Sequence, residues 1–150
     1  MNERIDLFLD NQKVATICCT DDDHHPYCFS CFYALDAKNG LLLFKTNADT
    51  HHAKLLMNND QVAGTIQPDK LNPLAIKGVQ FTGTVLRPSD DQCKEGSGIY
   101  HRTYPFALAM PGDIWAVLLE VVKMTDNTLS FGKKIHWQRN AGETIAVSYL

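Results

Sequence analysis

Hydroxyl and basic side chains gather around one strand–turn–helix stretch of the sequence, residues 41–59 (LLLFKTNADTHHAKLLMNN). Residues 41–44 are a continuous apolar run, which is typical of a strand buried on both faces. Asp49 or Thr50 has the short side-chain oxygen that caps the first turn of a helix. The unpaired N–H groups and the positive dipole end of a helix start attract anions. The basic and hydroxyl side chains near this start are Lys45, Thr46, Thr50, His51, His52 and Lys54.

This cluster predicts a phosphate-binding site. Cationic side chains at a helix start oppose the usual preference for acidic residues there, and a bound anion would offset that cost. The second interpretation is an exposed helix start whose charges face water. The spacing of the residues leaves both interpretations open.

Other groups with potential chemistry give weaker signals. Cys28 and Cys31 have CxxC spacing, but the alternation around them predicts a strand, which points them to opposite faces. The histidines at 24–25 and 51–52 are adjacent pairs, whereas zinc ligands on one helix face are spaced i and i+4. We therefore expect no metal site. Glycine-rich nucleotide motifs and the GxSxG nucleophile motif are missing from the sequence, so its catalytic residues stay unknown.

Composition predicts one soluble domain over residues 1–150, with 45% hydrophobic and 21% charged residues. The net charge of −3 argues against nucleic-acid binding, which needs a basic surface. Apolar runs stay below the roughly 18 residues of a membrane span, and the start MNERIDLFLD is too acidic for a signal peptide. Five cysteines are an odd number and fit reduced thiols. We therefore expect a cytoplasmic protein with no nucleic-acid or membrane partner.

Hydrophobic periodicity predicts six strands with short helices between pairs of strands. Strands are expected at 14–20, 27–35, 41–46, 61–67, 75–87 and 113–124, and helices at 3–10, at 50–59, from 88–91 onward and at 106–110. Asn39-Gly40 is a strong hairpin signal, so the strands on either side of it should pair antiparallel. Gly78 and Gly83 indicate bends that let a sheet curl, whereas Gly96 should weaken the third helix. An antiparallel barrel with small peripheral helices fits this pattern best.

Two further segments have patterns that bear on burial and on ligand binding. Strand 27–35 is mostly apolar on both faces, so both faces are expected to be buried. Residues 131–139 (FGKKIHWQR) place two aromatic side chains among four basic or protonatable ones. In isolation that segment fits an RNA-binding edge or a site where Trp137 stacks on a flat ligand, although single clusters of this kind are usually ordinary surface.

Six segments, in their order and spacing, carry a resemblance that covers nearly the whole chain. They are CFSCFYALDA (28–37), FKTNADTHHAK (44–54), VAGTI (62–66), IKGVQFTGTV (76–85), YHRTYP (100–105) and LEVVKMTDNTLSFGKKIHW (119–137). Together they resemble the FMN-binding split-barrel proteins, the superfamily of pyridoxamine-phosphate oxidase. The poorly characterised YhbP-type branch is the most similar.

The resemblance implies a mainly β fold, a six-stranded antiparallel Greek-key split barrel. It also implies a homodimer that holds FMN in two clefts between the subunits. The ribityl phosphate would fall on the cluster around Thr50, and the second strand, Ser30, Cys31, Phe32 and Tyr33, would lie along the isoalloxazine ring. Gln80 and Trp137 would approach from the partner subunit. The chain departs from the family pattern because its second strand lacks the phosphate-binding arginine and His51 stands where an arginine is usual.

The resemblance implies an FMN-dependent oxidoreductase that acts on an unidentified small molecule, in which the flavin does the chemistry. The alternative is a non-catalytic carrier or sensor that binds flavin or haem. A haem iron would take His24, His25, His51 or His52 as its axial ligand. A third hypothesis is a dimeric scaffold with a vestigial pocket.

Overall fold

The computed structural model describes residues 1–128 and 134–141. Its elements, in chain order, are α1 (Glu3–Asn11), β1 (Val14–Thr20), β2 (Pro26–Asp36), β3 (Leu41–Thr46), α2 (His51–Asn58), β4 (Gln61–Ile66), β5 (Lys77–Leu86), α3 (Asp91–Thr103), the 3₁₀ helix η1 (Pro105–Ala109), β6 (Asp113–Asp126) and β7 (Lys134–Gln138). None of the helices within these residues has the length and apolar content needed to cross a membrane.

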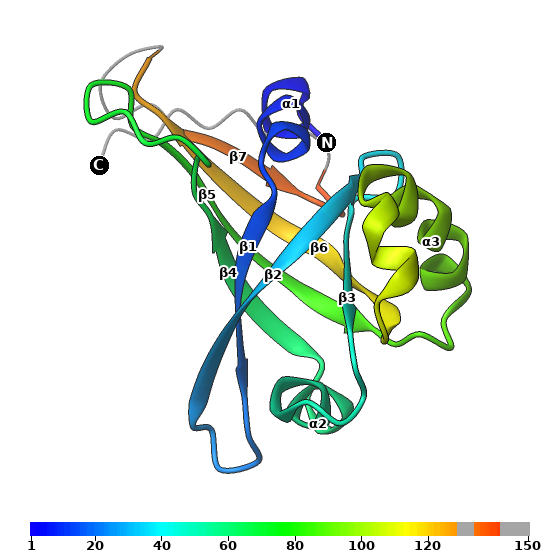
Figure 1. The fold of residues 1–150 in the computed structure, drawn as a ribbon. Helices are drawn as coiled ribbons and strands as arrows, with labels where there is room; N and C mark the ends of the chain where they lie inside the picture. The colour runs from blue at the N-terminus through cyan, green and yellow to red at the C-terminus, as the bar shows by residue number, and fades with distance from the viewer. Residues whose placement is uncertain (129–133, 142–150) are drawn as a thin grey trace.

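The strands form one antiparallel sheet in the order β3-β2-β1-β4-β5-β6-β7, and β3 also pairs with β6, which closes a six-stranded barrel (Figure 1). The predicted six-stranded antiparallel barrel with peripheral helices is therefore confirmed. Of the two bends predicted on the fifth strand, the one at Gly83 coincides with a shift in register between Thr82 and Gly83, whereas Gly78 pairs with Thr125 in regular register. The seventh strand, β7, was not predicted, because its five residues include Lys134 and His136 and lack an apolar run.

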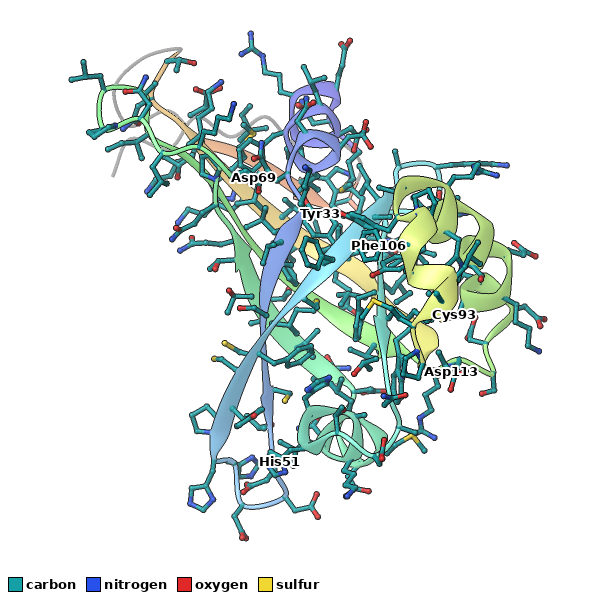
Figure 2. All side chains as sticks on the ribbon, viewed as in Figure 1. Tyr33, His51, Asp69, Cys93, Phe106 and Asp113 are labelled. Atoms are coloured by element: carbon teal, nitrogen blue, oxygen red, sulfur yellow. The ribbon has the colours of Figure 1, made fainter. Side chains whose placement is uncertain are left out.

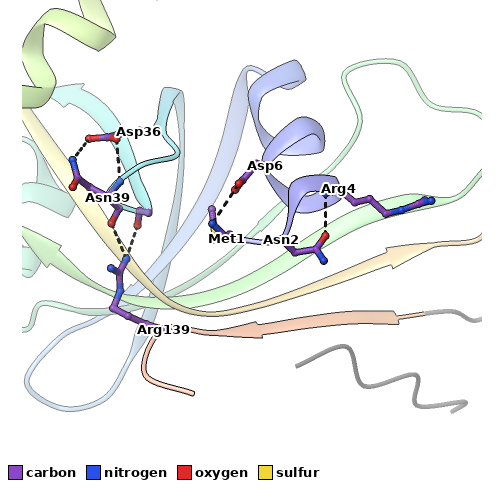
Figure 3. A network of polar contacts seen from close by, with 8 residues as sticks. Met1, Asn2, Arg4, Asp6, Asp36, Asn39 and Arg139 are labelled. Atoms are coloured by element: carbon purple, nitrogen blue, oxygen red, sulfur yellow. Dashed lines mark hydrogen bonds and ion pairs between the residues drawn. The ribbon is translucent and has the colours of Figure 1, made fainter. Parts of the chain in front are cut away.

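One edge of β6 is shared by two strands. The first half of β6 pairs with β3, and residues 121–125 pair with β7. Arg139 lies just after β7, and its guanidinium donates to the carbonyls of Asn39 at 3.1 Å and Gly40 at 2.9 Å (Figure 3). It also donates to the carbonyl of Leu119 in β6 at 2.7 Å. This side chain therefore links β6 to the hairpin between β2 and β3.

β3 is buried on both faces, as predicted. Leu42 and Phe44 belong to the core inside the barrel, whereas Leu41 and Leu43 pack with Tyr100 of α3 in a second core outside it. The inner core also contains apolar residues of α1 and α2, which cover opposite ends of the barrel (Figure 1).

α3 continues through Gly96, although glycine has a low helix propensity. A Cβ atom at Gly96 would lie 2.4 Å from Cδ2 of Leu43. The glycine therefore permits close contact between the helix and β3, and the burial of Leu43 compensates for its low helix propensity.

The expectation that both faces of the second strand are covered is wrong for residues 26–32 within one subunit. β2 pairs with β3 only through residues 33–36, and β1 pairs with β4 only through residues 16–18. The rest of the two strands extends from the barrel as a two-stranded arm (Figure 1). On this arm Tyr27 and Phe32 are exposed.

Arg139, which links β6 to the hairpin between β2 and β3, should contribute strongly to stability. Arg139→Ala removes three hydrogen bonds donated by a charged group and should lower the free energy of unfolding by about 2–3 kcal/mol, measured by urea denaturation. Arg139→Lys should recover little of this, because an ammonium cannot reach three carbonyls at once.

Gly40→Ala tests the same contact from the other side. Gly40 has φ +66°, and a Cβ there would lie 2.6 Å from Nη2 of Arg139. The substitution should cost about 1–3 kcal/mol for the left-handed backbone alone, and more where the arginine is present. A double-mutant cycle should therefore show a smaller cost in the Arg139→Ala background; equal costs in both backgrounds would contradict the contact.

Candidate functional site

A pocket of about 260 Å³ opens between β2, the end of β3, the first turn of α2 and the α3–η1 junction. Figure 2 shows Phe106 of η1 on the side of β2 that faces α3. Its lining combines apolar and aromatic side chains with basic and hydroxyl groups. The residues that line it are Phe29, Ser30, Cys31, Phe32, Lys45, Thr46, His52, Tyr100, Phe106, Ala107, Met110 and Pro111.

Lys45 reaches the pocket because it follows the buried run of β3 on the face that turns toward α3. Its Nζ donates to the carbonyl of Ala107 at 2.6 Å and lies 3.3 Å from Nε2 of His101. Nδ1 of His101 lies 2.9 Å from the carbonyl of Ser97, which can only accept, so Nδ1 carries the proton. Nε2 of a neutral His101 is then the acceptor that positions the Lys45 ammonium.

Thr46 points the other way, toward α2. Its Oγ1 lies 2.7 Å from Nε2 of His52, and the imidazole of His52 stacks on the ring of Phe29 with centroids 3.9 Å apart. Burial, and then the charge of His51, lower the pKa of His52. Burial thus favours the neutral form of the His52 ring where it lines the pocket.

The predicted start of α2 is confirmed, and Thr50 rather than Asp49 is its cap. Oγ1 of Thr50 accepts a hydrogen bond from the backbone N–H of Ala53 at 3.3 Å and donates to the carbonyl of Asn47 at 2.9 Å. It also lies 3.4 Å from Oγ1 of Thr46. The Thr50 hydroxyl is therefore engaged by the helix itself, beside the pocket.

The structure brings six of the sequence-predicted residues together in the pocket wall. They are Ser30, Cys31, Phe32, Lys45, Thr46 and His52. Burial raises the pKa of the Cys31 thiol to about 12, so this group stays protonated and neutral at physiological pH. The pocket wall therefore presents a neutral thiol beside aromatic rings.

Three other predicted residues lie near the pocket without lining it. His51 is exposed and its ring contacts Tyr27 of the β1–β2 arm edge-on, with centroids 4.7 Å apart (Figure 2). Lys54 is exposed on α2, one turn beyond the cap. Tyr33 is buried, and its hydroxyl donates to the carbonyl of Leu9, so it ties α1 to the barrel.

Gln80 and Trp137 lie elsewhere in this subunit. Gln80 is exposed on the outer face of the barrel, where its partners across the strands are Thr65 and Lys123. Trp137 of β7 packs against the barrel core, with the Arg139 guanidinium 5.5 Å from its ring. Part of the predicted segment 131–139, residues 131–133, is outside the described residues.

Sequence reasoning missed the side of the pocket formed by α3 and η1. Tyr100, Phe106 and Met110 line it, and His101 holds Lys45, yet all lie more than fifty residues after β3. The segment YHRTYP contributed to the resemblance without a role for its residues. The segment lies beside the pocket because β6, which follows η1, pairs with β3.

One group of potential metal ligands occurs among the described residues, in the turn of the β1–β2 arm. Ligand atoms of Asp21, Asp23 and His25 lie within 4.8 Å of one another. Oδ1 of Asp21 accepts from the backbone N–H of both Asp23 and His25, and these bonds lower the pKa of Asp21. The carboxylate therefore holds the turn, and the group is not part of the pocket.

The arrangement defines what kind of ligand the pocket suits. Phe29, Phe32, Phe106 and Met110 supply apolar and aromatic surface, and Lys45 supplies a cation in the same pocket. Flat ring systems stack on aromatic side chains, and anions bind an ammonium beside a helix start. The pocket therefore suits a flat aromatic ligand with an anionic tail.

Solved structures with the same architecture identify the fold class. A heme binding protein from Mycobacterium smegmatis superposes with a TM-score of 0.72 at 15% identity, over 87% of this chain and 55% of that one. A pyridoxamine 5′-phosphate oxidase-related, FMN binding protein from Nostoc punctiforme has a TM-score of 0.69 at 10% identity, over 99% and 95%. A FAD-binding protein from Mesorhizobium loti has a TM-score of 0.68 at 16% identity, over 84% and 94%. The fold is a split barrel of the pyridoxamine-phosphate-oxidase type.

The family follows from more similar sequences. A UPF0306 protein of Photorhabdus laumondii subsp. laumondii is 41% identical over 136 residues, which cover 90% of this chain and 94% of the relative. Another, from Serratia proteamaculans, is 36% identical over 137 residues, 91% and 94%. A comparison with family models finds no match. The chain belongs to the UPF0306 family, which confirms the YhbP-type resemblance.

The lowered pKa of His52 gives a pH dependence with a definite sign. The folded protein binds the proton less readily than the unfolded chain, so the free energy of unfolding should rise as pH rises through the range from the lowered pKa to about 6.5. His52→Gln should flatten that rise in urea titrations across pH 5–7. A ring resonance of His52 that titrates at or above 6.5 in the free protein would contradict this cause.

Proposed function

We propose that this protein binds FMN in the pocket and acts as an FMN-dependent oxidoreductase on a small molecule. The observation that carries the proposal is that one pocket with aromatic lining contains the ammonium of Lys45, on its α3–η1 side, and the side chains of Thr46 and His52, on its α2 side. The phosphate would lie between these groups and the isoalloxazine ring along Ser30, Cys31 and Phe32 of β2.

The phosphate end has several independent sources of attraction. Lys45 is held in place by the carbonyl of Ala107 and by His101, so less side-chain entropy remains to be lost on binding. Thr46 offers a hydroxyl, and the first turn of α2 offers N–H groups and partial positive charge. Thr50 contributes indirectly in this arrangement, because it sets where that first turn begins.

A second subunit would complete the site. The pocket of about 260 Å³ falls below the range of about 300–1,000 Å³ that is usual for a ligand site. Phe32 and Phe106 at its wall are about half exposed, at 49% and 59%. We therefore propose a homodimer in which the partner covers these rings, and in which Gln80 and Trp137 approach the partner's cofactor.

The outer face of the barrel offers a surface for this contact. A shallow, largely apolar region there is lined by residues of β1, β4, β5 and β6, among them Cys18, Ala63, Thr82 and Val121. Small side chains make the face flat, which suits a twofold contact between identical surfaces. Gln80 borders the same region.

In this proposal the cofactor would carry out the chemistry and the protein would bind and position it. When bound, FMN supplies hydride or electron transfer, and the chain binds it, orients it and excludes water. Cys31 would stay a neutral thiol against the ring because its pKa is raised to about 12. We expect a cytoplasmic location, since free cysteines suit a reducing compartment.

Haem is the competing ligand, because one structural neighbour is a heme binding protein. Of the histidines considered as axial ligands, His52 lines the pocket, with Nε2 hydrogen-bonded to Thr46 and its ring stacked on Phe29. Haem binding would require that arrangement to break. A flavin spectrum in the protein loaded with FMN supports the proposal, whereas tight haem binding with a Soret band and no flavin binding favours a haem carrier or sensor.

The phosphate site predicts a difference between FMN and riboflavin. Lys45→Met removes the ammonium and should weaken FMN binding about 10- to 100-fold, the scale of a lost hydrogen bond to a charged group. Riboflavin lacks the phosphate, so its weaker binding should change little. Flavin fluorescence titration measures both affinities.

Lys54→Met is the matched control, because Lys54 carries the same charge on exposed α2 outside the pocket. It should leave FMN affinity nearly unchanged. If the two variants weaken FMN equally, only the net charge matters and the phosphate is held elsewhere. Equal affinity of the wild-type protein for FMN and riboflavin would also reject the site.

The proposed dimer contact predicts the effect of a charge at its centre. Ala63 is exposed on the outer face, and Ala63→Arg should place an unpaired charge between the subunits and give monomers at micromolar concentration. Ser89→Arg adds the same charge in an exposed loop before α3 and should leave the dimer intact. Sedimentation velocity distinguishes the states, and a monomeric wild-type protein with FMN present would exclude this assembly.

A further inference from the structure

Two cysteines face each other across the β1–β2 arm. Cys18 of β1 lies directly opposite Cys28 of β2 in the antiparallel register. Backbone bonds fix the type of this pair: Tyr33 N–H donates to the carbonyl of Lys13 at 2.9 Å, and Asp21 N–H donates to the carbonyl of His25 at 3.1 Å.

Hydrogen-bonded pairs recur every two residues along such a ladder. Cys18 and Cys28 therefore form a non-hydrogen-bonded pair, in which opposite Cα atoms lie about 4.5 Å apart. That spacing falls within the range of about 4.4–6.8 Å that a disulfide spans. The next such pair on the same face, Thr16 and Ser30, has its two hydroxyl oxygens 3.4 Å apart, so side chains at these positions touch.

The other three cysteines are not positioned to form a disulfide with Cys18 or Cys28. Cys19 and Cys31 alternate onto the opposite face of the arm, and Cys19 is buried. Cys93 is buried under α3, where its thiol donates to the carbonyl of Leu86 at 3.5 Å. Of the five cysteines, Cys18 and Cys28 are therefore the pair positioned to form a disulfide.

The two thiols differ in exposure. Cys28 is exposed and open to a small oxidant, whereas Cys18 is partly buried. A hydrogen bond to the Cys28 sulfur, and then burial, raise the pKa of Cys18 to about 11. Because it is the more exposed of the two, Cys28 is the sulfur that an oxidant reaches first.

We propose that Cys18 and Cys28 form a reversible intrachain disulfide across the β1–β2 arm, with a peroxide as oxidant. The Cys28 thiolate attacks one peroxide oxygen and breaks the O–O bond, which gives a sulfenic acid and hydroxide. The Cys18 sulfur then attacks the Cys28 sulfur, its proton leaves with the displaced hydroxyl as water, and the S–S bond forms. Two electrons pass from the thiols to the peroxide. The second step is intramolecular and needs no access for the oxidant to Cys18.

The disulfide would close a short loop around the turn of the arm. It would covalently join β1 and β2 at the last residue of β1 that pairs with β4, where β2 has no second sheet neighbour, next to Phe29 and Ser30 of the pocket wall. An exposed disulfide of this kind is readily reduced, as expected of a transient bond in a reducing compartment. The proposal does not depend on which ligand the pocket binds.

The test is oxidation of the full chain with hydrogen peroxide, followed by alkylation of the remaining thiols and intact mass measurement. We expect wild-type protein to lose two alkylatable thiols and 2 Da in about one step, and to recover both with dithiothreitol. Cleavage before aspartate separates the cysteines into peptides 10–20 and 23–35. The oxidised sample should then contain these two peptides joined, with fragmentation locating the bond at Cys18 and Cys28.

Cys18→Ala and Cys28→Ala change a half-exposed and an exposed side chain, so both variants should fold. Neither should form the joined peptides, and Cys18→Ala should leave a sulfenic acid on Cys28 that dimedone traps. The proposal is overturned if wild-type protein keeps five alkylatable thiols after peroxide. A bond located at Cys19 or Cys31, or a covalent dimer on a non-reducing gel, would overturn it as well.

Discussion

The pairing of β3 with β6 is the constraint on which the pocket depends. In its register Lys45 lies opposite Ile114 and Thr46 lies opposite Asp113, so β3 ends where β6 begins. The chain enters β6 from η1, and this register therefore places η1 beside Lys45. Burial of β3 on both faces holds the register, because a shift of one residue would turn its apolar side chains to the wrong cores.

Local signals were enough to predict the half of the site that is contiguous in sequence. The apolar run of β3, the turn after it and the cap at Thr50 are each decided within a few residues, and they place Lys45, Thr46 and His52 together. The α3–η1 half could not be predicted in the same way. Its contact with Lys45 depends on the closing pair of strands, which joins residues about seventy positions apart.

The β1–β2 arm shows a second limit of sequence patterns. An apolar alternation indicates that a face can be buried, but not what covers it. The arm leaves the barrel where β3 and β4 stop pairing, so its apolar residues stay exposed in one subunit. Gln80 and Trp137 show the same limit: the resemblance singles them out, but in one subunit neither lines the pocket. Their proposed role would depend on assembly, because only the partner in the proposed homodimer would bring them to a cofactor.

Electrostatics at the pocket explain how a site without the arginines of the oxidase pattern could still hold a phosphate. Among the described residues that line the pocket, Lys45 alone carries a permanent positive charge, and burial lowers the pKa of His52, which favours its neutral form. A phosphate with nearly two negative charges would therefore rely on one ammonium, the start of α2 and neutral hydroxyl donors. Such a phosphate would also favour protonation of His52, which opposes the effect of burial. The balance of these two effects on one histidine, rather than a fixed arginine, would then set the affinity at each pH.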